Sequence, residues 1–292
     1  MVLLIKVNHL ITTMPSHVYT HTDLPEYFEF VSDIHNPDIC EKFENGVIQV
    51  FDSFPLLDGV DLEFLARIGP AEDTKAIRKT SEQQMLADMG EGALQDHILR
   101  HFTDNERDAR NLQQLILDLS ERYRQYFREI LPGYEVEKEK NTWRFTETRG
   151  KNMHLDNYYH PDKFYIRMFT NLDLEPRVWR TSYTFEDAFE MQRDAVSDLA
   201  PNEICFALND LIFGPSTFWK ENEAAGFTFP YHEFHFQPGT AWLVYSQRIS
   251  HQIEYGNRML SSTGILPAAG MQNPEQSFDA ILRSLREPVA AE

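Results

Sequence analysis

Asn152-Met153-His154-Leu155-Asp156-Asn157 is the stretch that decides how this chain is interpreted, together with His251 almost a hundred residues later. In an extended strand, alternate side chains point to the same side, so His154 and Asp156 would both face the inside of a sheet or barrel. A histidine from a facing strand would complete a set of two imidazoles and one carboxylate. Such a set leaves three positions open on an octahedral iron, as in non-haem Fe(II) oxygenases. The sequence therefore predicts His154, Asp156 and His251 as metal ligands and catalytic residues.

Other histidines compete with this interpretation. A second His-x-Asp pair, His21-Thr22-Asp23, lies between Pro15 and Pro25 in a polar stretch that is unsuited to a buried strand. His235 is an alternative third ligand, in the run His232-Glu233-Phe234-His235. That run lacks the four-residue spacing of the His-Glu-x-x-His metalloprotease motif. We therefore expect the first pair at the surface and keep His235 as an alternative to His251.

Composition limits the classes of protein and of partner. The 292 residues are 42% hydrophobic and include 21 Phe, 12 Tyr and 4 Trp, which is enough for a large β-rich core. The formal net charge of -19 would repel phosphate backbones, so nucleic acid is excluded as an expected partner. Two cysteines, Cys40 and Cys205, indicate a reduced, cytoplasmic setting and no disulfide framework. The apolar run at 2–7 is too short to span a membrane, so no integral membrane segment is expected.

The first half of the chain is predicted to be mainly helical. Residues 46–51 are β-branched and bounded by turn residues, which favours a strand. A short helix is expected over 58–68, and residues 71–102 are charged and typical of helix. The clearest helix runs from about 104 to 131, with Thr103 and Glu106 as a capping box. Its apolar residues recur at a spacing of three and four, and we expect them to pack against a sheet.

From about residue 142 the sequence changes to short extended runs with Gly and Pro turns. This pattern is typical of a sandwich or jelly-roll barrel. A helical insertion is expected at about 185–225, and Tyr255-Gly256-Asn257 is expected to form a hairpin. The predicted strands are 141–148, the His-x-Asp stretch, 163–171, 177–180, 231–236, 240–245 and 258–266.

These elements suggest one catalytic domain with two terminal segments. Residues 1–30 would be an N-terminal tail, and 268–292 a C-terminal helix and tail. The domain would span 31–267, with mixed helical support at 31–140 and the jelly-roll core at 141–267.

An iron site with three open positions can bind 2-oxoglutarate through two of them and dioxygen through the third. The far carboxylate of that cosubstrate then needs a fixed cation, usually an arginine or lysine. Arg167 and Arg258 are the candidates, and Asn171 lies on the same predicted strand face as Arg167. A charge in the apolar run around Arg167 is tolerated only if it meets an anion.

Candidate substrate-binding residues surround the proposed ligands. They combine aromatic walls with positive charge, which suits a small carboxylate-bearing molecule. His160, four residues after Asp156, is better placed to touch substrate than iron. The full set is Tyr158, Tyr159, His160, Arg177, Trp179 and Arg180.

Several blocks together resemble a known family. They are Met-His-Leu-Asp at 153–156, Ile-Arg-Met-Phe-Thr-Asn-Leu-Asp at 166–173, Glu-Pro-Arg-Val-Trp-Arg at 175–180, and Phe-Gln-Pro-Gly-Thr-Ala-Trp-Leu-Val-Tyr at 236–245 ahead of Ile-Ser-His. Over roughly residues 45–267 the chain resembles the Kdo hydroxylases, Fe(II)/2-oxoglutarate dioxygenases that hydroxylate 3-deoxy-D-manno-octulosonic acid.

The resemblance implies a mainly β protein with supporting helices around a double-stranded β-helix, the jelly-roll or cupin-like core. It also implies Fe(II), 2-oxoglutarate and O2 as cofactors and a small-molecule substrate, with His154, Asp156 and His251 as the iron ligands. Two alternatives stay open. One is a related 2-oxoglutarate oxygenase of amino-acid or natural-product metabolism, which would hydroxylate, desaturate or cyclise its substrate. The other is a metal-binding cupin-like protein that does not use 2-oxoglutarate. The sequence leaves the oligomeric state open.

Overall fold

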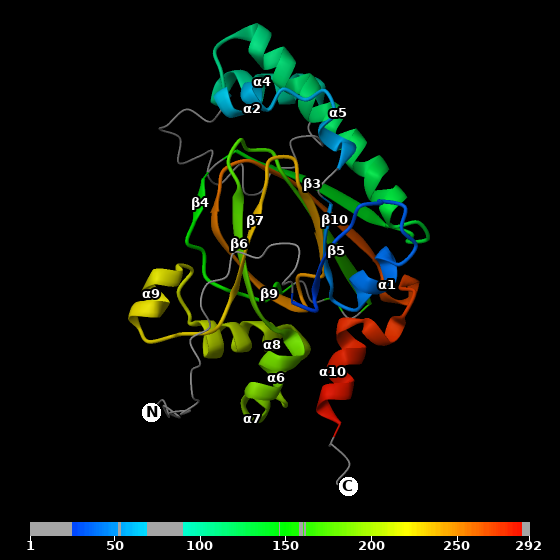
Figure 1. The fold of residues 1–292 in the computed structure, drawn as a ribbon, viewed down its shortest axis with the longest axis vertical. Coiled ribbons are helices and arrows are strands. Elements are labelled where there is room, and N and C mark those ends of the chain that lie inside the picture. Colours follow the sequence, from blue (N-terminus) through cyan, green and yellow to red (C-terminus); the bar gives the residue numbers. More distant parts are fainter. Residues whose placement is uncertain are drawn as a thin grey trace.

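The strands that the structure describes form two sheets that face each other (Figure 1). The computed structural model describes residues 25–51, 54–68, 90–145, 147–157, 160 and 162–287. The larger sheet has the order β1-β2-β8-β5-β10-β3 and the smaller β4-β9-β6-β7, and of these neighbours only β1 and β2 run parallel. The strands are β1 (Phe28–Phe30), β2 (Ile48–Phe51), β3 (Lys138–Arg144), β4 (Thr148–Arg149), β5 (Lys163–Asn171), β6 (Arg177–Thr184), β7 (His232–Phe236), β8 (Ala241–Val244), β9 (Ile249–Gly256) and β10 (Met259–Pro267).

This arrangement confirms the predicted fold class of a mainly β protein with supporting helices. The tail expected at 1–30 contains a strand at its end, because β1 pairs with β2. Other predictions lie outside the described residues: His21–Asp23, the run at 2–7, Tyr158 and Tyr159, and much of the charged segment at 71–102.

Side chains alternate between the two faces of the six-stranded sheet, and both faces pack against other parts of the protein. On β5, Phe164, Ile166 and Met168 belong to the core cluster that lies outside this sheet. Phe169 points the other way, where its ring meets that of Trp179 from the opposite sheet at 5.3 Å. Alternate residues of one strand thus fill two cores, one under the helices and one between the sheets.

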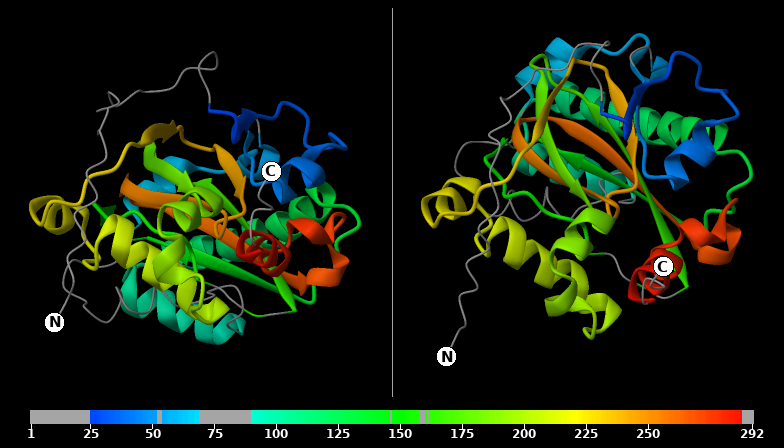
Figure 2. Two further views of the ribbon diagram at one scale, coloured as in Figure 1. Left: turned by 90° about the horizontal axis from the view of Figure 1, so that it is seen from below. Right: turned by 60° about the horizontal axis from the view of Figure 1, so that its bottom comes forward.

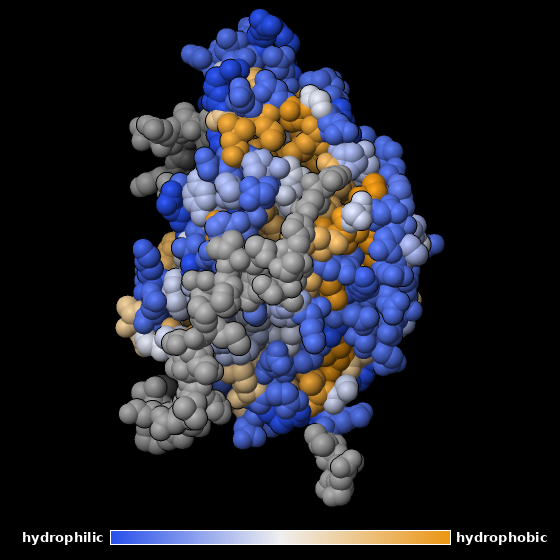
Figure 3. Space-filling view, viewed as in Figure 1, coloured by the Kyte–Doolittle hydropathy of each residue, from blue (hydrophilic) through white to orange (hydrophobic). Residues whose placement is uncertain are grey.

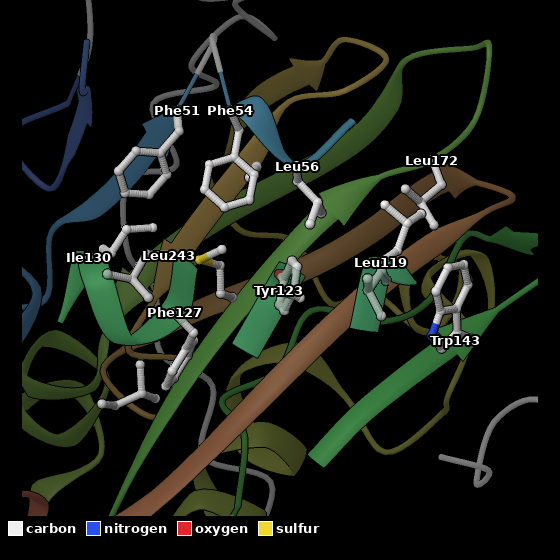
Figure 4. Close-up of a cluster of buried hydrophobic side chains, with 14 of the residues drawn as sticks. Phe51, Phe54, Leu56, Leu119, Tyr123, Phe127, Ile130, Trp143, Leu172 and Leu243 are labelled. Atoms are coloured by element: carbon white, nitrogen blue, oxygen red, sulfur yellow. The ribbon is translucent and has the colours of Figure 1, made fainter. Parts of the chain in front are cut away.

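The helix α5 (Glu106–Ile130) covers the outer face of the larger sheet (Figure 2). Figure 4 shows its buried stripe, including Tyr123 and Phe127, against Trp143 and Leu243 of the sheet. The predicted cap is wrong by two residues. The side chain of Asn105 accepts the N–H groups of Arg107 and Asp108, at 2.9 and 3.2 Å. Asn105 is the cap because its backbone is extended, as a capping residue requires. The hydroxyl of Thr103 instead accepts the N–H of Asn105.

Most of the other helices gather at two ends of the molecule (Figure 1). At one end lie α2 (Leu62–Arg67) and α4 (Glu91–His101). The helix expected over 58–68 is shorter than predicted, because Asp61 caps it by accepting the N–H of Phe64. At the other end lie the helices of the predicted insertion and the predicted C-terminal helix, which are α6 (Phe185–Met191), α7 (Arg193–Val196), α8 (Pro201–Leu208), a π-helical turn (Asn209–Phe213), α9 (Trp219–Ala224) and α10 (Phe278–Arg286).

A short helix near the start of the described chain is hydrogen-bonded to a loop near its end. The buried carboxylate of Glu44, the last residue of α1 (Ile39–Glu44), accepts the N–H groups of Gln272 and Asn273, each at 2.7 Å. It also accepts the hydroxyl of Tyr134 at 2.5 Å. The 3-10 turns are η1 (Pro55–Leu57), η4 (Ala268–Gly270) and η5 (Pro274–Gln276).

The hairpin predicted at Tyr255-Gly256-Asn257 is wrong. β9 pairs with β4 and β6, whereas β10 pairs with β3 and β5, so the chain crosses from one sheet to the other at this point. Gly256 serves packing and not a tight turn, since a Cβ there would overlap the buried side chain of Arg177. β10 is buried on both faces and therefore occupies the inside of the larger sheet.

The surface is largely hydrophilic on the face shown in Figure 3, in keeping with the excess of acidic residues. An apolar patch lies beneath α2 and α4 in this view. Within the described ranges, no helix has the length and the apolar character needed to cross a membrane.

Gly264 gives a direct test of the contact between β10 and α5. A Cβ at this position would lie 2.7 and 2.8 Å from two ring atoms of Phe127, which is fully buried. Gly264→Ala should therefore lower the free energy of unfolding by about 1–3 kcal/mol, measured by equilibrium urea denaturation. Adding Phe127→Leu should recover part of that loss. Gly92→Ala is the matched control, because nothing lies within 4 Å of a Cβ there and alanine suits helix α4. An equal effect at both glycines would contradict the packing argument.

Candidate metal centre

The His-x-Asp stretch is extended but lies outside the regular strands, which corrects the prediction of a strand. His154 and His251 form an isolated antiparallel bridge beyond the end of β4, with N–H to C=O distances of 3.0 and 2.9 Å in the two directions. The N–H of Asp156 donates to the carbonyl of Ser246 at 3.0 Å. The regular β4 stops at Arg149, and these separate bonds then hold the ligand segment beside β9.

Both imidazoles are oriented by the same kind of contact. The Nδ1 of His154 lies 2.9 Å from the carbonyl of Asn152, and the Nδ1 of His251 lies 3.2 Å from that of Ile249. Because a carbonyl only accepts, each Nδ1 carries the proton and each Nε2 keeps its lone pair. This arrangement is typical of metal-binding histidines, whose second nitrogen donates to a backbone carbonyl or carboxylate.

The three side chains converge on one point. The Nε2 of His154 is 3.7 Å from Asp156 Oδ1, and the Nε2 of His251 is 3.9 Å from Asp156 Oδ2. Two ligands that are each about 2.1 Å from one ion lie at most about 4.2 Å apart, so both separations fit a shared ion. These three residues also form the one group of His, Cys, Asp and Glu with metal-site geometry found among the described residues.

Burial and charge prepare these groups to bind a cation. Burial, followed by repulsion from His154, lowers the pKa of His251 to about 4, so its imidazole is neutral near pH 7. Burial alone would raise the pKa of Asp156, but Arg167 and the two histidines hold it well below its usual range. The carboxylate is therefore ionised. The indole of Trp179 stacks on His251 with ring centroids 5.0 Å apart and fixes the ring plane.

Of the three residues predicted to bind cosubstrate, one lies at the metal centre and two lie elsewhere. Arg167 reaches the centre, with its Nη1 2.5 Å from Asp156 Oδ2. Arg258 instead contacts Asp173 at 3.5 Å and donates to the carbonyl of Ala66. Asn171 donates to the carbonyls of Glu175 and Phe236, which fixes the loop after β5.

Of the three predicted substrate residues on β6, only one lies beside the metal centre. Trp179 lies against His251, but Arg180 faces away from the centre and pairs with Glu233 and Glu254. Arg177 lies four residues before Thr181, the residue paired with His251, and thus about 13 Å farther along the strand. Its guanidinium is fully buried, and this burial, with repulsion from Arg144, lowers its pKa to about 9.

Two further histidines lie away from the ligand atoms. His235 is exposed on β7 beside Glu233, with 3.0 Å between Nε2 and Oε1. It pairs with Val178, so it lies on the face of the sheet opposite to Trp179. His160 is exposed in the loop that follows Asp156.

Some residues at the centre carried no signal in the sequence. The side chain of Ser246 hydrogen-bonds to Asp156, and the amide of Asn209 binds the backbone of Leu155. Burial, with the nearby charge of Asp156, raises the pKa of Cys205 to about 12, and this thiol is not part of the group of three converging ligands. Sequence motifs for metal sites are defined by the spacing of the ligands themselves. They therefore give no indication of a serine or asparagine that only contacts the ligand segment.

Comparison with solved structures shows that the fold is similar to that of an enzyme, KdoO. The chain is 18% identical to the Kdo hydroxylase KdoO in complex with cobalt(II), with 91% of this chain and 99% of that chain covered and a TM-score of 0.58. Against KdoO with succinate and Fe(III) the identity is 19%, the coverage 89% and 95%, and the TM-score 0.56. KdoO is a non-haem Fe(II) α-ketoglutarate-dependent dioxygenase. At this identity the likeness shows a shared fold and confirms the expected jelly-roll core.

Comparison with curated proteins found no match. The model of one family, 3-deoxy-D-manno-oct-2-ulosonic acid (Kdo) hydroxylase, matches residues 29–205 and 215–288. This covers most of the chain, including both halves of the His154, Asp156 and His251 centre, and it confirms the resemblance and the enzyme class expected from the sequence. The chain belongs to the Kdo hydroxylase family.

Proposed function

We propose that the protein is an Fe(II)- and 2-oxoglutarate-dependent dioxygenase that hydroxylates Kdo or a Kdo-containing molecule. The observation that carries the proposal is the convergence of His154, Asp156 and His251 in a chain of this family. Two imidazole nitrogens and one carboxylate oxygen, held from one side, match the ligand set of non-haem iron oxygenases.

Bound iron would supply the activation of dioxygen, with one oxygen atom going to the substrate while 2-oxoglutarate becomes succinate and carbon dioxide. The protein's own part is positioning. The carbonyls of Asn152 and Ile249 hold both imidazoles with their Nε2 atoms toward the carboxylate. The packed rings of Trp179, Phe169 and Trp242 exclude water from the interior beside His251.

The first experiment is anaerobic addition of 2-oxoglutarate to the Fe(II)-loaded protein, followed by absorption spectroscopy. Chelation of the cosubstrate should give a weak visible charge-transfer band. Admission of oxygen with Kdo should then give succinate and a product heavier by one oxygen atom. Iron binding without the band would contradict 2-oxoglutarate chemistry and favour the cupin-like alternative. A band with succinate release that Kdo does not stimulate would point to another substrate.

We propose that Arg167 binds the far carboxylate of 2-oxoglutarate. It is the predicted arginine that reaches the centre, and it stands over the inward-facing ring of Phe169 at 4.6 Å. Met259 pairs with Asn171, four residues beyond Arg167, so Arg258 lies at least about 13 Å from the level of Arg167. Neither Arg258 nor Asn171 is part of the site that we propose.

Arg167→Met should raise the dissociation constant for 2-oxoglutarate roughly 10- to 100-fold, because charged hydrogen bonds contribute about 1.5–3 kcal/mol. The measurement is titration of the charge-transfer band, with iron content determined separately. Arg258→Met is the matched control and should leave cosubstrate affinity unchanged. Unaltered affinity in Arg167→Met would remove this residue from the cosubstrate site.

We propose that the loop after Asp156, with Tyr158, Tyr159 and His160, borders a small-molecule substrate. The loop begins at a metal ligand, and the amide of Asn157 fastens it by donating to the carbonyl of Asn202 in α8 at 3.1 Å. We also place the activity in the cytoplasm, since Cys40 and Cys205 are both buried without a disulfide.

A further inference from the structure

The peptide of Leu155, between two of the proposed ligands, is bound by a side chain from the helical insertion. The N–H of Leu155 donates to Asn209 Oδ1 at 2.8 Å, and Asn209 Nδ2 donates to the carbonyl of Leu155 at 3.0 Å. A carboxamide that binds both groups of one residue replaces the two bonds that a neighbouring strand would supply.

This contact lies where no strand is available. His154 and Asp156 direct their N–H groups to His251 and Ser246, on the side of β9. β4, which the ligand segment continues, is at the edge of its sheet, so no strand of the described sheets lies on its other side. On that side Phe218 forms an isolated bridge with Lys151, and Asn209 supplies the backbone bonds farther along, at Leu155.

The position of Asn209 is itself determined by packing. It is the first residue of the π-helical turn that follows α8, between the buried side chains of Leu208 and Ile212. Both belong to the same core cluster as Met153 and Leu155, which alternate with the ligands along the chain. A π turn changes the direction in which the following side chains leave a helix, and such turns are frequent at functional sites.

We propose that Asn209 is a positioning residue that sets the direction of His154 and Asp156 by fixing the Leu155 peptide between them. The inference rests on the proposed metal site. Rotation of that peptide would turn both neighbouring side chains, since alternate residues share one face only while the segment stays extended. Residues that orient metal ligands typically change metal affinity or activity by 10- to 100-fold when replaced.

The test compares metal binding by the full-length protein and two variants, with Co(II) as the probe. Asn209→Ala removes both bonds to Leu155 and should weaken Co(II) binding by about tenfold or more. It should also change the visible ligand-field spectrum of the bound ion, because the ligand geometry changes. Asn209→Asp keeps the acceptor for the Leu155 N–H and loses the donor, so a smaller effect is expected. This second variant also serves if Asn209→Ala does not fold.

Asn222 offers a matched control in the same insertion. Its amide makes the same pair of bonds to the backbone of Ser216 in place of Leu155, both at 2.9 Å. Asn222→Ala should lower the melting temperature while Co(II) affinity and spectrum stay as in the wild type. If Asn209→Ala behaves like Asn222→Ala, Asn209 only stabilises the insertion and the proposal is overturned. Wild-type protein that binds no Co(II) would instead overturn the proposed metal site itself, so the two failures are distinguishable.

Discussion

Asp156→Ala is expected to abolish both iron binding and 2-oxoglutarate-dependent succinate formation. The variant would leave two imidazoles and no carboxylate next to the guanidinium of Arg167, whose Nη1 lies 2.5 Å from the Asp156 carboxylate in the wild type. A cation that enters such a site loses an anionic ligand and gains an unopposed positive neighbour, so both changes oppose binding. Iron content after anaerobic reconstitution and succinate release are the measurements.

The matched control is a similar pair of residues on the outer face of the smaller sheet. His235→Ala removes a histidine that lies 3.0 Å from a carboxylate but away from the proposed centre. It should bind iron and release succinate as the wild type does. Asp156→Asn tests the same idea with less change in volume. Full succinate formation by either Asp156 variant would refute the proposed triad.

Glu44→Ala should destabilise the fold by about 3–5 kcal/mol, because it leaves three hydrogen-bond donors without their buried acceptor. The side chain of Glu44 is almost fully buried, and its donors are Tyr134 and the N–H groups of Gln272 and Asn273. Burial, with this hydrogen bond to Glu44, raises the pKa of Tyr134, so the phenol remains a donor. Equilibrium denaturation in urea measures the loss.

Three variants make this prediction specific. Tyr134→Phe removes one of the three bonds and should cost about 1.5 kcal/mol. Glu44→Gln should fall between the two, since one amide N–H group must then face a backbone N–H. Glu41→Ala, on the exposed side of the same helix, should stay within about 0.5 kcal/mol of the wild type. Equal stabilities for Glu41→Ala and Glu44→Ala would show that the buried carboxylate is dispensable.

The sequence predicted the elements whose evidence is local. The apolar stripe of α5 and the alternating apolar residues of β5 record which faces are buried, and both elements occur where expected. The error at the start of α5 is equally local. Asn105 and Thr103 are both good capping residues, and only the backbone conformation at Asn105 decides between them.

Strand pairing was beyond such patterns. The residues near Gly256 do not indicate that β9 and β10 belong to different sheets. The sheet of each strand depends on partner strands that are distant in the sequence. The predicted hairpin failed because the glycine accommodates the buried Arg177, a contact made only in the folded chain.

The candidate site was predicted from residue types, and its surroundings were not. His154, Asp156 and His251 have chemistry that stands out in a sequence, and the structure brings them together. The apolar run around Arg167 favoured it over Arg258, but both stayed candidates, because only the structure shows which arginine reaches Asp156. Asn209 could not be found at all, because an asparagine at the end of a helix is ordinary until the peptide that it binds is known.

Because strands far apart in the sequence pair with each other, parts of the fold cannot form until late in synthesis of the chain. β10 lies between β3 and β5 in the larger sheet, so the edge strand β3 has no partner in that sheet until residue 267 has left the ribosome. The partner of His154, His251, is likewise made late. Proteins dominated by such distant contacts fold slowly, because long loops must close before the contacts form. Growing chains therefore carry His154 and Asp156 long before His251 is made, and a chain that stops before β10 would leave β3 without a partner strand in the larger sheet.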